Sequence, residues 1–154
     1  MPIKQNNEEN TTGFDLARFI EAQEKVYTQV IAELGKGEKR SHWMWFIFPQ
    51  VDGLGTSATA KKYAIKSVEE AKAYAQHPLL GQRLLECCYL LLATQDKTAT
   101  EILGTPDDHK LQSCMTLFAK LIPEESVYVT VLVKFYGGKI DPRTIIILKE
   151  ISGN

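Results

Sequence analysis

Both tryptophans of the chain lie in one short stretch, residues 41–50, which reads SHWMWFIFPQ. Lys39 and Arg40 precede the stretch, and a helix that begins there would present unpaired backbone N–H groups with partial positive charge. Basic side chains at a helix N-terminus can hold a phosphate or a carboxylate. Trp43 and Trp45 could add a flat wall for a base or a sugar ring. The stretch therefore predicts a site for a small anionic or nucleotide-like ligand.

The loop after the stretch carries polar groups that could read the edges of such a ligand. Gly53 and Gly55 are two residues apart, which indicates backbone angles closed to other residues or a close approach by a ligand. Gln50 begins this loop, and Ser57 ends it. A polar side chain at the end of an apolar block needs a partner when it is buried. We therefore expect ligand contacts from this loop as well.

A second group of candidates follows a proline farther along the chain. Asp107, Lys110 and Ser113 are three residues apart, so one helical face could present all three. Lys110 could activate the Ser113 hydroxyl if burial lowered its pKa; a capped helix start with a solvated face is the alternative. No catalytic triad or carboxylate pair can be identified from spacing, so no catalytic residue is assigned. The predicted ligand-binding residues are Arg40, His42, Trp43, Trp45, Gln50, Gly53, Gly55, Ser57 and Lys110.

The aromatic stretch has a structural interpretation too. Apolar residues cover every face of residues 42–48, so this segment should be buried on all sides, as a short helix capped by Ser41 or as a short strand. In that case most of its aromatic side chains are core. Function is then expected at the two edges, before Trp43 and from Gln50 onward.

The surrounding chain has the periodicity and the end signals of helices. Apolar steps of three and four predict a first and longest helix over residues 14–34, stopped by Gly35. Residues 127–133 are rich in β-branched side chains, which favour a strand, but the proline before them and Gly137 after them favour a helix. The other predicted helices are 58–64, 68–76, about 78–93, 99–103, 106–122 and 142–150, the last with Ile145, Ile146 and Leu148 buried. The predicted fold is an all-α, compact array of about seven or eight mostly short helices around a central apolar helix.

Length and composition favour one ordinary globular unit. The chain has 154 residues, of which 44% are hydrophobic and 24% charged. We predict a disordered tail over residues 1–12, which are polar, and a single helical domain over residues 13–154. No apolar run reaches the length of a membrane span, and the N-terminus lacks the pattern of a signal peptide, so we expect a cytoplasmic protein.

Charge and metal-ligand spacing argue against two classes of partner. Lys and Arg number 18 and Asp and Glu number 19, so no net field attracts a polyanion and nucleic acid is an unlikely partner. The three cysteines are expected to be reduced, buried, apolar side chains. Neither they nor the three histidines have zinc-site spacing, so no metal site is predicted.

Several segments together carry a family resemblance. They include SHWMWFIFPQ at 41–50, GLGTS at 53–57, HPLLGQRL at 77–84, GTPDDHKLQS at 104–113 and DPRT at 141–144. With these blocks the chain resembles the bacterial family called Domain of Unknown Function 1810, sometimes labelled calpastatin-like. The resemblance spans residues 14 to about 148. It implies a compact multihelical fold in which other helices surround one helix, and it supplies no reaction or cofactor.

Two functional hypotheses compete at this point. The first is binding of a small anionic or nucleotide-like molecule near the aromatic stretch, with the chemistry unspecified. The second is a non-catalytic protein-protein interaction module, with a homodimer as one form. The first predicts a concave site reached by His42, a tryptophan face and Gln50. The second predicts an exposed apolar patch.

Overall fold

Helices make up the regular secondary structure of residues 14–152, the part of the chain that the computed structural model describes. Within that range the chain forms ten helices and no strand, which confirms the all-α prediction. The predicted tail, residues 1–12, lies outside the described residues. The helices are α2 (Ala17–Glu24), α3 (Tyr27–Lys36), α4 (Met44–Ile47), α5 (Ala58–Lys62), α6 (Val68–Gln76), α7 (Leu80–Ala93), α8 (Ala99–Leu103), α9 (Asp107–Leu121), α10 (Val127–Tyr136) and α11 (Pro142–Ile151).

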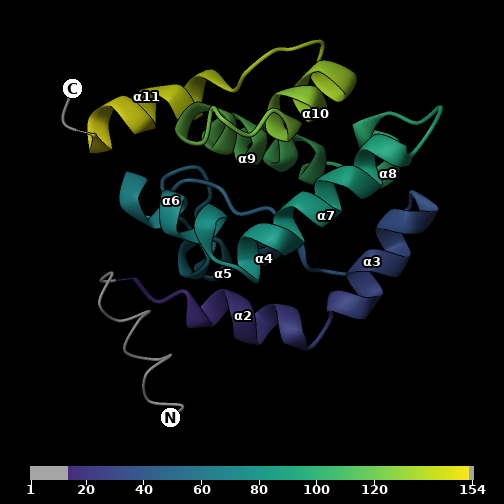
Figure 1. The fold of residues 1–154 in the computed structure, drawn as a ribbon, viewed down its shortest axis with the longest axis horizontal. Helices are drawn as coiled ribbons and strands as arrows, with labels where there is room; N and C mark the ends of the chain where they lie inside the picture. The colour runs from purple at the N-terminus through teal and green to yellow at the C-terminus, as the bar shows by residue number, and fades with distance from the viewer. Residues whose placement is uncertain (1–13, 153–154) are drawn as a thin grey trace.

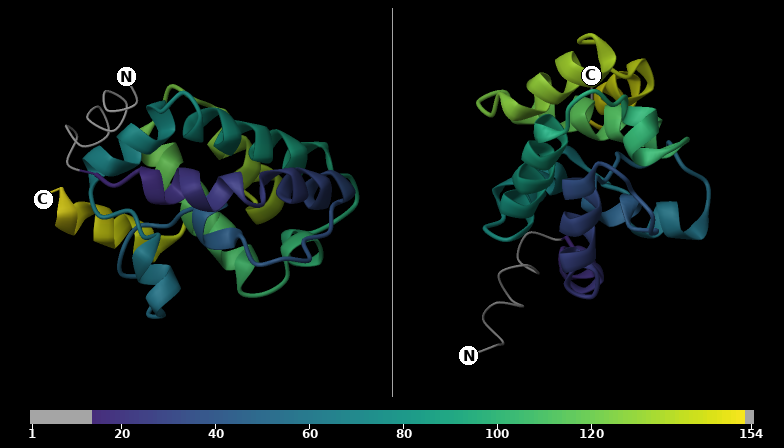
Figure 2. Two further views of the ribbon diagram at one scale, coloured as in Figure 1. Left: turned by 90° about the horizontal axis from the view of Figure 1, so that it is seen from below. Right: turned by 90° about the vertical axis from the view of Figure 1, so that its right-hand side faces the viewer.

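The helices pack in layers around α7 and α9. Helix α9 contacts α6, α8, α10 and α11, while α7 contacts α3, α4, α6 and α10. Figures 1 and 2 show α10 and α11 on one side of the molecule and α2 and α3 on the opposite side. The short helix α4 lies between them, against α2 and α7. No described helix combines the length and the apolar character that crossing a membrane requires.

The first predicted helix is wrong in its length, because the chain turns at Lys25 and Val26 and forms α2 and α3 instead. The turn lets the two halves of one apolar stripe face different neighbours, α2 against α4 and α3 against α7. The longest helix among the described residues is α9, with 15 residues. Helix α3 also continues past Gly35 and ends at Gly37, which has a left-handed φ of 70°. Its N–H donates to the carbonyls of Glu33 and Leu34.

The aromatic stretch is mostly core, as its apolar faces predict. Trp43 and Phe48 are fully buried, and Met44, Phe46 and Ile47 are at most 8% exposed. Contacts between aromatic rings extend the core into α9 and α10. The pairs are Phe19–Tyr74, Tyr74–Phe118 and Phe118–Tyr128, with ring centroids 4.9, 5.8 and 5.6 Å apart. Buried Gln23 joins α2 to this core, since its side-chain amide donates to the Phe46 carbonyl at 2.8 Å. The apolar stretch therefore lies at the centre of the fold.

The cysteines are core side chains as well. All three, Cys87, Cys88 and Cys114, are free thiols with no exposed surface. Burial raises the pKa of Cys87 to about 12, and it raises the pKa values of the other two thiols well above their usual range. A thiol in such a state is a poor nucleophile. The prediction that these residues act as small apolar side chains is confirmed.

Ser and Thr side chains cap several helices, at positions where the residue types and their spacing predict an N-cap. The hydroxyls of Ser57, Ser67 and Thr98 accept N–H groups in the first turns of α5, α6 and α8, and Thr98 completes a capping box with Glu101. The β-branched segment is helix α10, which ends at Gly137 with a φ of 61°. In this segment helix-end signals decide the structure over strand propensity.

Two local predictions are wrong. Ser41 does not cap α4: Trp43 occupies that position without a side-chain hydrogen bond, and the Ser41 hydroxyl donates to Glu33 instead. On α11, Leu148 is buried but Ile146 is 57% exposed. Thr144, which is fully buried, lies one turn before Leu148, so these two residues define the face of α11 toward the core.

Candidate functional site

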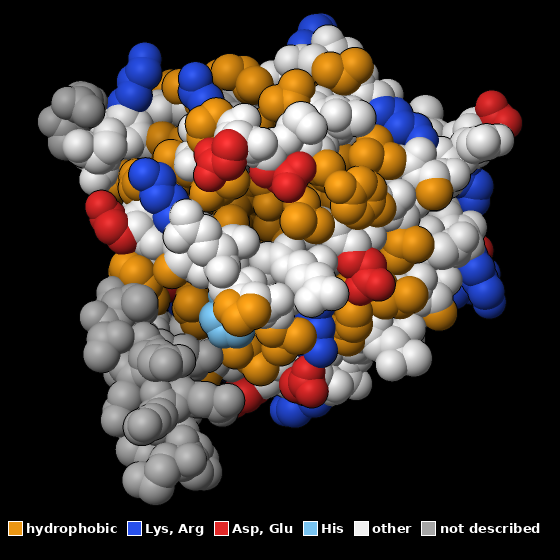
Figure 3. Space-filling model, viewed as in Figure 1, with side chains coloured by type: hydrophobic (Ala, Val, Ile, Leu, Met, Phe, Trp, Pro, Cys, Tyr) orange, Lys and Arg blue, Asp and Glu red, His pale blue; other side chains and the backbone are white. Residues whose placement is uncertain are grey.

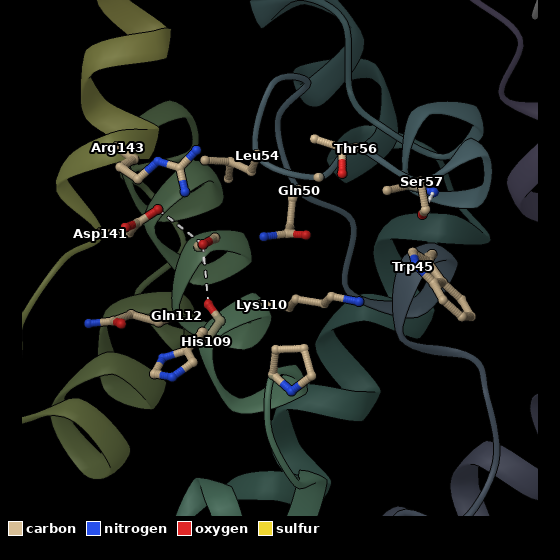
Figure 4. Close-up of a pocket in the computed structure, with 14 residues that line it drawn as sticks. Trp45, Gln50, Leu54, Thr56, Ser57, His109, Lys110, Gln112, Asp141 and Arg143 are labelled. Carbon is tan, nitrogen blue, oxygen red and sulfur yellow. Dashed lines mark hydrogen bonds between the residues drawn. The ribbon is translucent and has the colours of Figure 1, made fainter.

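A cleft of about 520 Å³ lies where the loop after α4 meets α9 and the start of α11 (Figure 4). Trp45 comes from α4 itself, and a cluster of polar side chains comes from α9 and α11. The lining residues are Trp45, Gln50, Leu54, Gly55, Thr56, Ser57, Ala60, Pro106, His109, Lys110, Gln112, Ser113, Asp141 and Arg143. Segments that are far apart in the sequence therefore form one concave surface.

The loop that carries Gln50 is fixed by the backbone. The Ile65 N–H donates to the Gln50 carbonyl at 2.9 Å, and the Asp52 N–H donates to the Ile65 carbonyl at 2.8 Å. Val51 between them is buried and forms an isolated parallel bridge with Ile65. At Gly55 the loop runs so close to α5 that an added Cβ would lie 2.6 Å from the Ala60 Cβ. The backbone is thus held in place while the Gln50 side chain points into the cleft.

Gln50 and Arg143 are unpaired side chains of the cleft within residues 14–152. Neither the Gln50 amide nor the Arg143 guanidinium has a hydrogen bond or an ion pair with any residue between 14 and 152. Every buried side-chain N or O atom of the described residues has a hydrogen-bond partner. The unpaired groups of Gln50 and Arg143 are therefore accessible to solvent. Arg143 stands in the first turn of α11, directly after Pro142, and Gln50 stands at the middle of the cleft (Figure 4). Their hydrogen-bonding capacity is available to a ligand.

Lys110 reaches into the same cleft from α9. Its ammonium group lies 3.6 Å from an Asp107 carboxylate oxygen and 4.9 Å from the centre of the Trp45 ring. Asp107 is shared, since its other oxygen pairs with Lys39 at 2.8 Å. The ammonium group is therefore held beside the indole. Because Asp107 is shared with Lys39, it neutralises the positive charge of Lys110 only in part.

Ser113 does not pair with Lys110, although the sequence predicts that Asp107, Lys110 and Ser113 could share one helical face. Its hydroxyl lies 3.0 Å from an Asp141 carboxylate oxygen and 3.2 Å from the His109 carbonyl (Figure 4). The same Asp141 oxygen accepts the N–H and the hydroxyl of Thr144, so Asp141 caps the N-terminus of α11. This pair therefore anchors α11 to α9 and sets the position of Arg143. Lys110 keeps Asp107 and Trp45 as its partners.

The basic edge before the aromatic stretch is occupied from within the protein. The buried Glu33 carboxylate accepts the backbone N–H groups of Arg40 and Ser41 at 2.9 and 3.1 Å and the Trp43 indole N–H at 2.8 Å. Burial raises the pKa of Glu33, but the hydrogen bonds from Ser41, Arg40 and Trp43 outweigh it and lower that pKa to about 2. The donors that we expected to hold a ligand anion hold this carboxylate.

The structure brings together five of the nine predicted ligand-binding residues. Trp45, Gln50, Gly55, Ser57 and Lys110 all line the cleft. The other four lie outside its lining.

Those four residues have other surroundings. Trp43 is in the core, and His42 is exposed beside it. Arg40 has a side chain that is 71% exposed and pairs with Glu38. At Gly53 the nearest side chain to an added Cβ would be Ile147, on α11.

Residues that the prediction did not include complete the cleft. Arg143, Asp141 and Thr56 were not proposed as ligand contacts, although the first two lie in the DPRT block of the family resemblance. The Asp-Pro start of α11 indicated a helix but not its neighbours. No group of three or more His, Cys, Asp and Glu residues within the described range could hold a metal ion.

Comparisons with known proteins agree with this fold. A profile of the family described as "Protein of unknown function (DUF1810)" matches residues 13–148. A search of curated proteins gives no match. Among solved structures, the chain is similar to the crystal structure of the conserved hypothetical protein Rv1873 from Mycobacterium tuberculosis. The two are 52% identical over 88% of this chain and 97% of that chain, with a TM-score of 0.87.

Proposed function

Since the chain belongs to the DUF1810 family, whose function is unknown, we propose a function from the cleft itself: it binds a small anionic molecule. One observation carries the proposal. The Arg143 guanidinium lines the cleft with no acidic partner among residues 14–152, and the Lys110 ammonium group enters the same space. A planar guanidinium forms two parallel hydrogen bonds to a carboxylate or a phosphate.

The local charge favours an anion although the whole chain is balanced. The lining contains two cations, Lys110 and Arg143, and one carboxylate, Asp141. One oxygen of that carboxylate already accepts three hydrogen bonds, which reduces its repulsion of a second anion. On the face drawn in Figure 3, basic and acidic side chains are interspersed, so that face carries no extended region of one sign. Attraction of an anion is therefore expected to be local to the cleft.

The size of the cleft supports a small molecule. Its volume of about 520 Å³ falls within the range of roughly 300–1,000 Å³ that is typical of ligand pockets. Its walls combine an indole, Leu54 and Ala60 with polar side chains from the loop after α4, from α9 and from the start of α11. Such walls orient a ligand by a few hydrogen bonds while apolar contacts cover the rest of it.

Calorimetric titration with inorganic pyrophosphate tests the proposal. We expect binding by the wild-type protein, weakened roughly 10- to 100-fold in Arg143→Gln, because a charge-assisted contact is lost. The free Arg143 side chain makes no hydrogen bond or ion pair with residues 14–152, so this variant should keep its stability.

Arg40→Gln is the matched control, since Arg40 is an exposed arginine outside the cleft. It should bind pyrophosphate as the wild type does. The proposal fails if the wild type shows no binding, or if Arg40→Gln loses as much affinity as Arg143→Gln.

A second candidate function, self-association, has its own observation. Among residues 14–152, five of the six exposed large apolar side chains lie on α10, on α11 or between them. They are Val129, Val133, Ile140, Ile146 and Ile151. Light scattering after size exclusion should then show a dimer that Val133→Ser with Ile146→Ser converts to a monomer. A wild-type monomer at all accessible concentrations would reject this function.

A further inference from the structure

We infer that the ligand of the cleft is a nucleoside phosphate, with its phosphate at Arg143 and its base against Trp45 and the Gln50 amide. This inference rests on the proposed function, because it assigns the anion of that same site. It adds the chemical class of the remainder of the ligand and names the two residues that recognise it.

The cleft has two ends of different character (Figure 4). Arg143 and Asp141 lie at one end, with Ser113 bonded to Asp141, and Trp45 lies with Ser57 at the other. The side chains of Gln50 and Lys110 project into the space between the two ends. A ligand that fills the cleft therefore meets a cation at one end and an aromatic ring at the other.

Trp45 is the side chain of α4 that the core does not enclose. Its neighbours on that helix, Met44, Phe46 and Ile47, are 1, 8 and 2% exposed, whereas the indole of Trp45 is half-buried and lines the cleft. An indole held at the wall of a cationic cleft is a stacking surface for a base, and base stacking tolerates any base because each has a π-face.

The Lys110 ammonium group lies over the Trp45 ring in the structure, at 4.9 Å from its centre. A base that stacks on this face displaces the ammonium group. The phosphate of the same ligand offers it a new, charge-assisted partner, which is a stronger contact than one with an exposed ring. Lys110 therefore leaves the Trp45 ring and pairs with the phosphate, so binding of the base and binding of the phosphate are coupled.

Gln50 supplies the polar contact for the base. Its amide presents one hydrogen-bond acceptor and one donor group, and no residue between 14 and 152 satisfies either. Glutamine recognises an adenine edge by two such bonds, because donor and acceptor are adjacent on both partners. The backbone of Gln50 is held by the Ile65 N–H, so the fold sets the point from which the amide enters the cleft.

Tryptophan fluorescence measures this contact directly. The chain has two tryptophans; Trp43 is fully buried, so a change on titration reports Trp45. We expect adenosine monophosphate to quench the emission and to bind about 5- to 100-fold more tightly than ribose 5-phosphate, which lacks the base. Adenosine, which lacks the phosphate, should bind more weakly than the monophosphate.

Two variants complete the experiment. Measured by calorimetric titration, because Trp45→Leu removes the fluorescent reporter, Gln50→Leu and Trp45→Leu should remove the preference for adenosine monophosphate while leaving the affinity for ribose 5-phosphate unchanged. If Trp45→Leu does not fold, Gln50→Leu still decides, because the Gln50 side chain makes no hydrogen bond that the fold needs. His42→Ala, outside the cleft, is the control and should behave as the wild type.

The outcomes separate the two proposals. Equal binding of ribose 5-phosphate and adenosine monophosphate, with both dependent on Arg143, overturns this inference and leaves the anion site standing. Binding of neither phosphate overturns both. A preference for the nucleotide that survives Gln50→Leu and Trp45→Leu overturns the assignment of these residues.

Discussion

Replacement of Glu33 by glutamine should cost the protein about 2–4 kcal/mol at neutral pH. The carboxylate is 6% exposed and accepts hydrogen bonds from the Ser41 hydroxyl, the Arg40 and Ser41 N–H groups and the Trp43 indole. Glutamine keeps one acceptor oxygen and turns an NH₂ group toward these donors, so buried donors lose their partner. The expected loss corresponds to one or two charged hydrogen bonds rather than to their full sum, because neighbouring contacts are not additive.

The pH dependence follows from the direction in which the pKa of Glu33 moves. Burial raises this pKa, and hydrogen bonds from Ser41, Arg40 and Trp43 outweigh burial and lower it from 4.5 to about 2. The stabilisation is therefore fully present above pH 4.5 and is lost as the pH falls toward 2. At about 1.4 kcal/mol for each tenfold change in proton affinity, the drop corresponds to at most about 3.5 kcal/mol.

Urea unfolding of the wild type and Glu33→Gln at a series of pH values measures the effect. The difference in unfolding free energy should be large at neutral pH and should shrink steadily below pH 4.5, because only the wild type has a carboxylate at position 33, which the unfolded chain protonates more readily than the folded protein does. Glu38→Gln, in the loop that follows α3 and with a side chain that is 52% exposed, is the control and should change stability by less than about 0.5 kcal/mol. A Glu33→Gln protein as stable as the wild type at neutral pH would refute the role of this carboxylate.

Two further pairs of substitutions test the fold by thermal or urea unfolding. Gly35→Ala should stabilise the protein by about 0.5–1 kcal/mol, because the residue is inside α3 and an added Cβ meets no atom within 4 Å. Gly37→Ala should destabilise it by about 1–2 kcal/mol, because Gly37 has a left-handed φ of 70° and its Cβ would lie 3.0 Å from a Thr94 methyl group. Leu148→Ala should cost about 2–4 kcal/mol, whereas Ile146→Ala should change stability by less than about 0.5 kcal/mol. Reversal of the order within either pair would show that the end of α3 or the buried face of α11 is assigned incorrectly.

Sequence reasoning identified the features of the fold that depend on neighbouring residues. The cap at Thr98, the ends of α10 and the all-α class follow from short-range signals that the structure bears out. The turn at Val26 does not, because the apolar spacing continues across it and the break serves packing against two different helices. The orientation of α11 likewise depends on what lies under Thr144, which the spacing of its isoleucines does not reveal.

The candidate site divides in the same way. Trp45, Gln50 and Lys110 were proposed from residue type, and the fold brings them to one cleft. The residue types around Arg40 predict an anion site, because a basic side chain precedes a helix start. The Arg40 N–H, however, donates to the carboxylate of Glu33 on the preceding helix. Arg143 was not proposed because nothing in its neighbourhood indicates that α11 begins beside α9. Contacts between residues far apart in the sequence decide both cases.

An NMR titration of ¹⁵N-labelled protein with inorganic pyrophosphate tests the central claim most directly. The chain has two indole N–H signals: Trp43 donates to Glu33 in the core, and Trp45 lines the cleft beside Lys110. Binding in the cleft predicts a saturable shift of the Trp45 indole signal and of the Lys110 and Arg143 amides, while the Trp43 signal stays in place. Shifts confined to Trp43 and the Arg40 region, or no saturable shift, would contradict the claim.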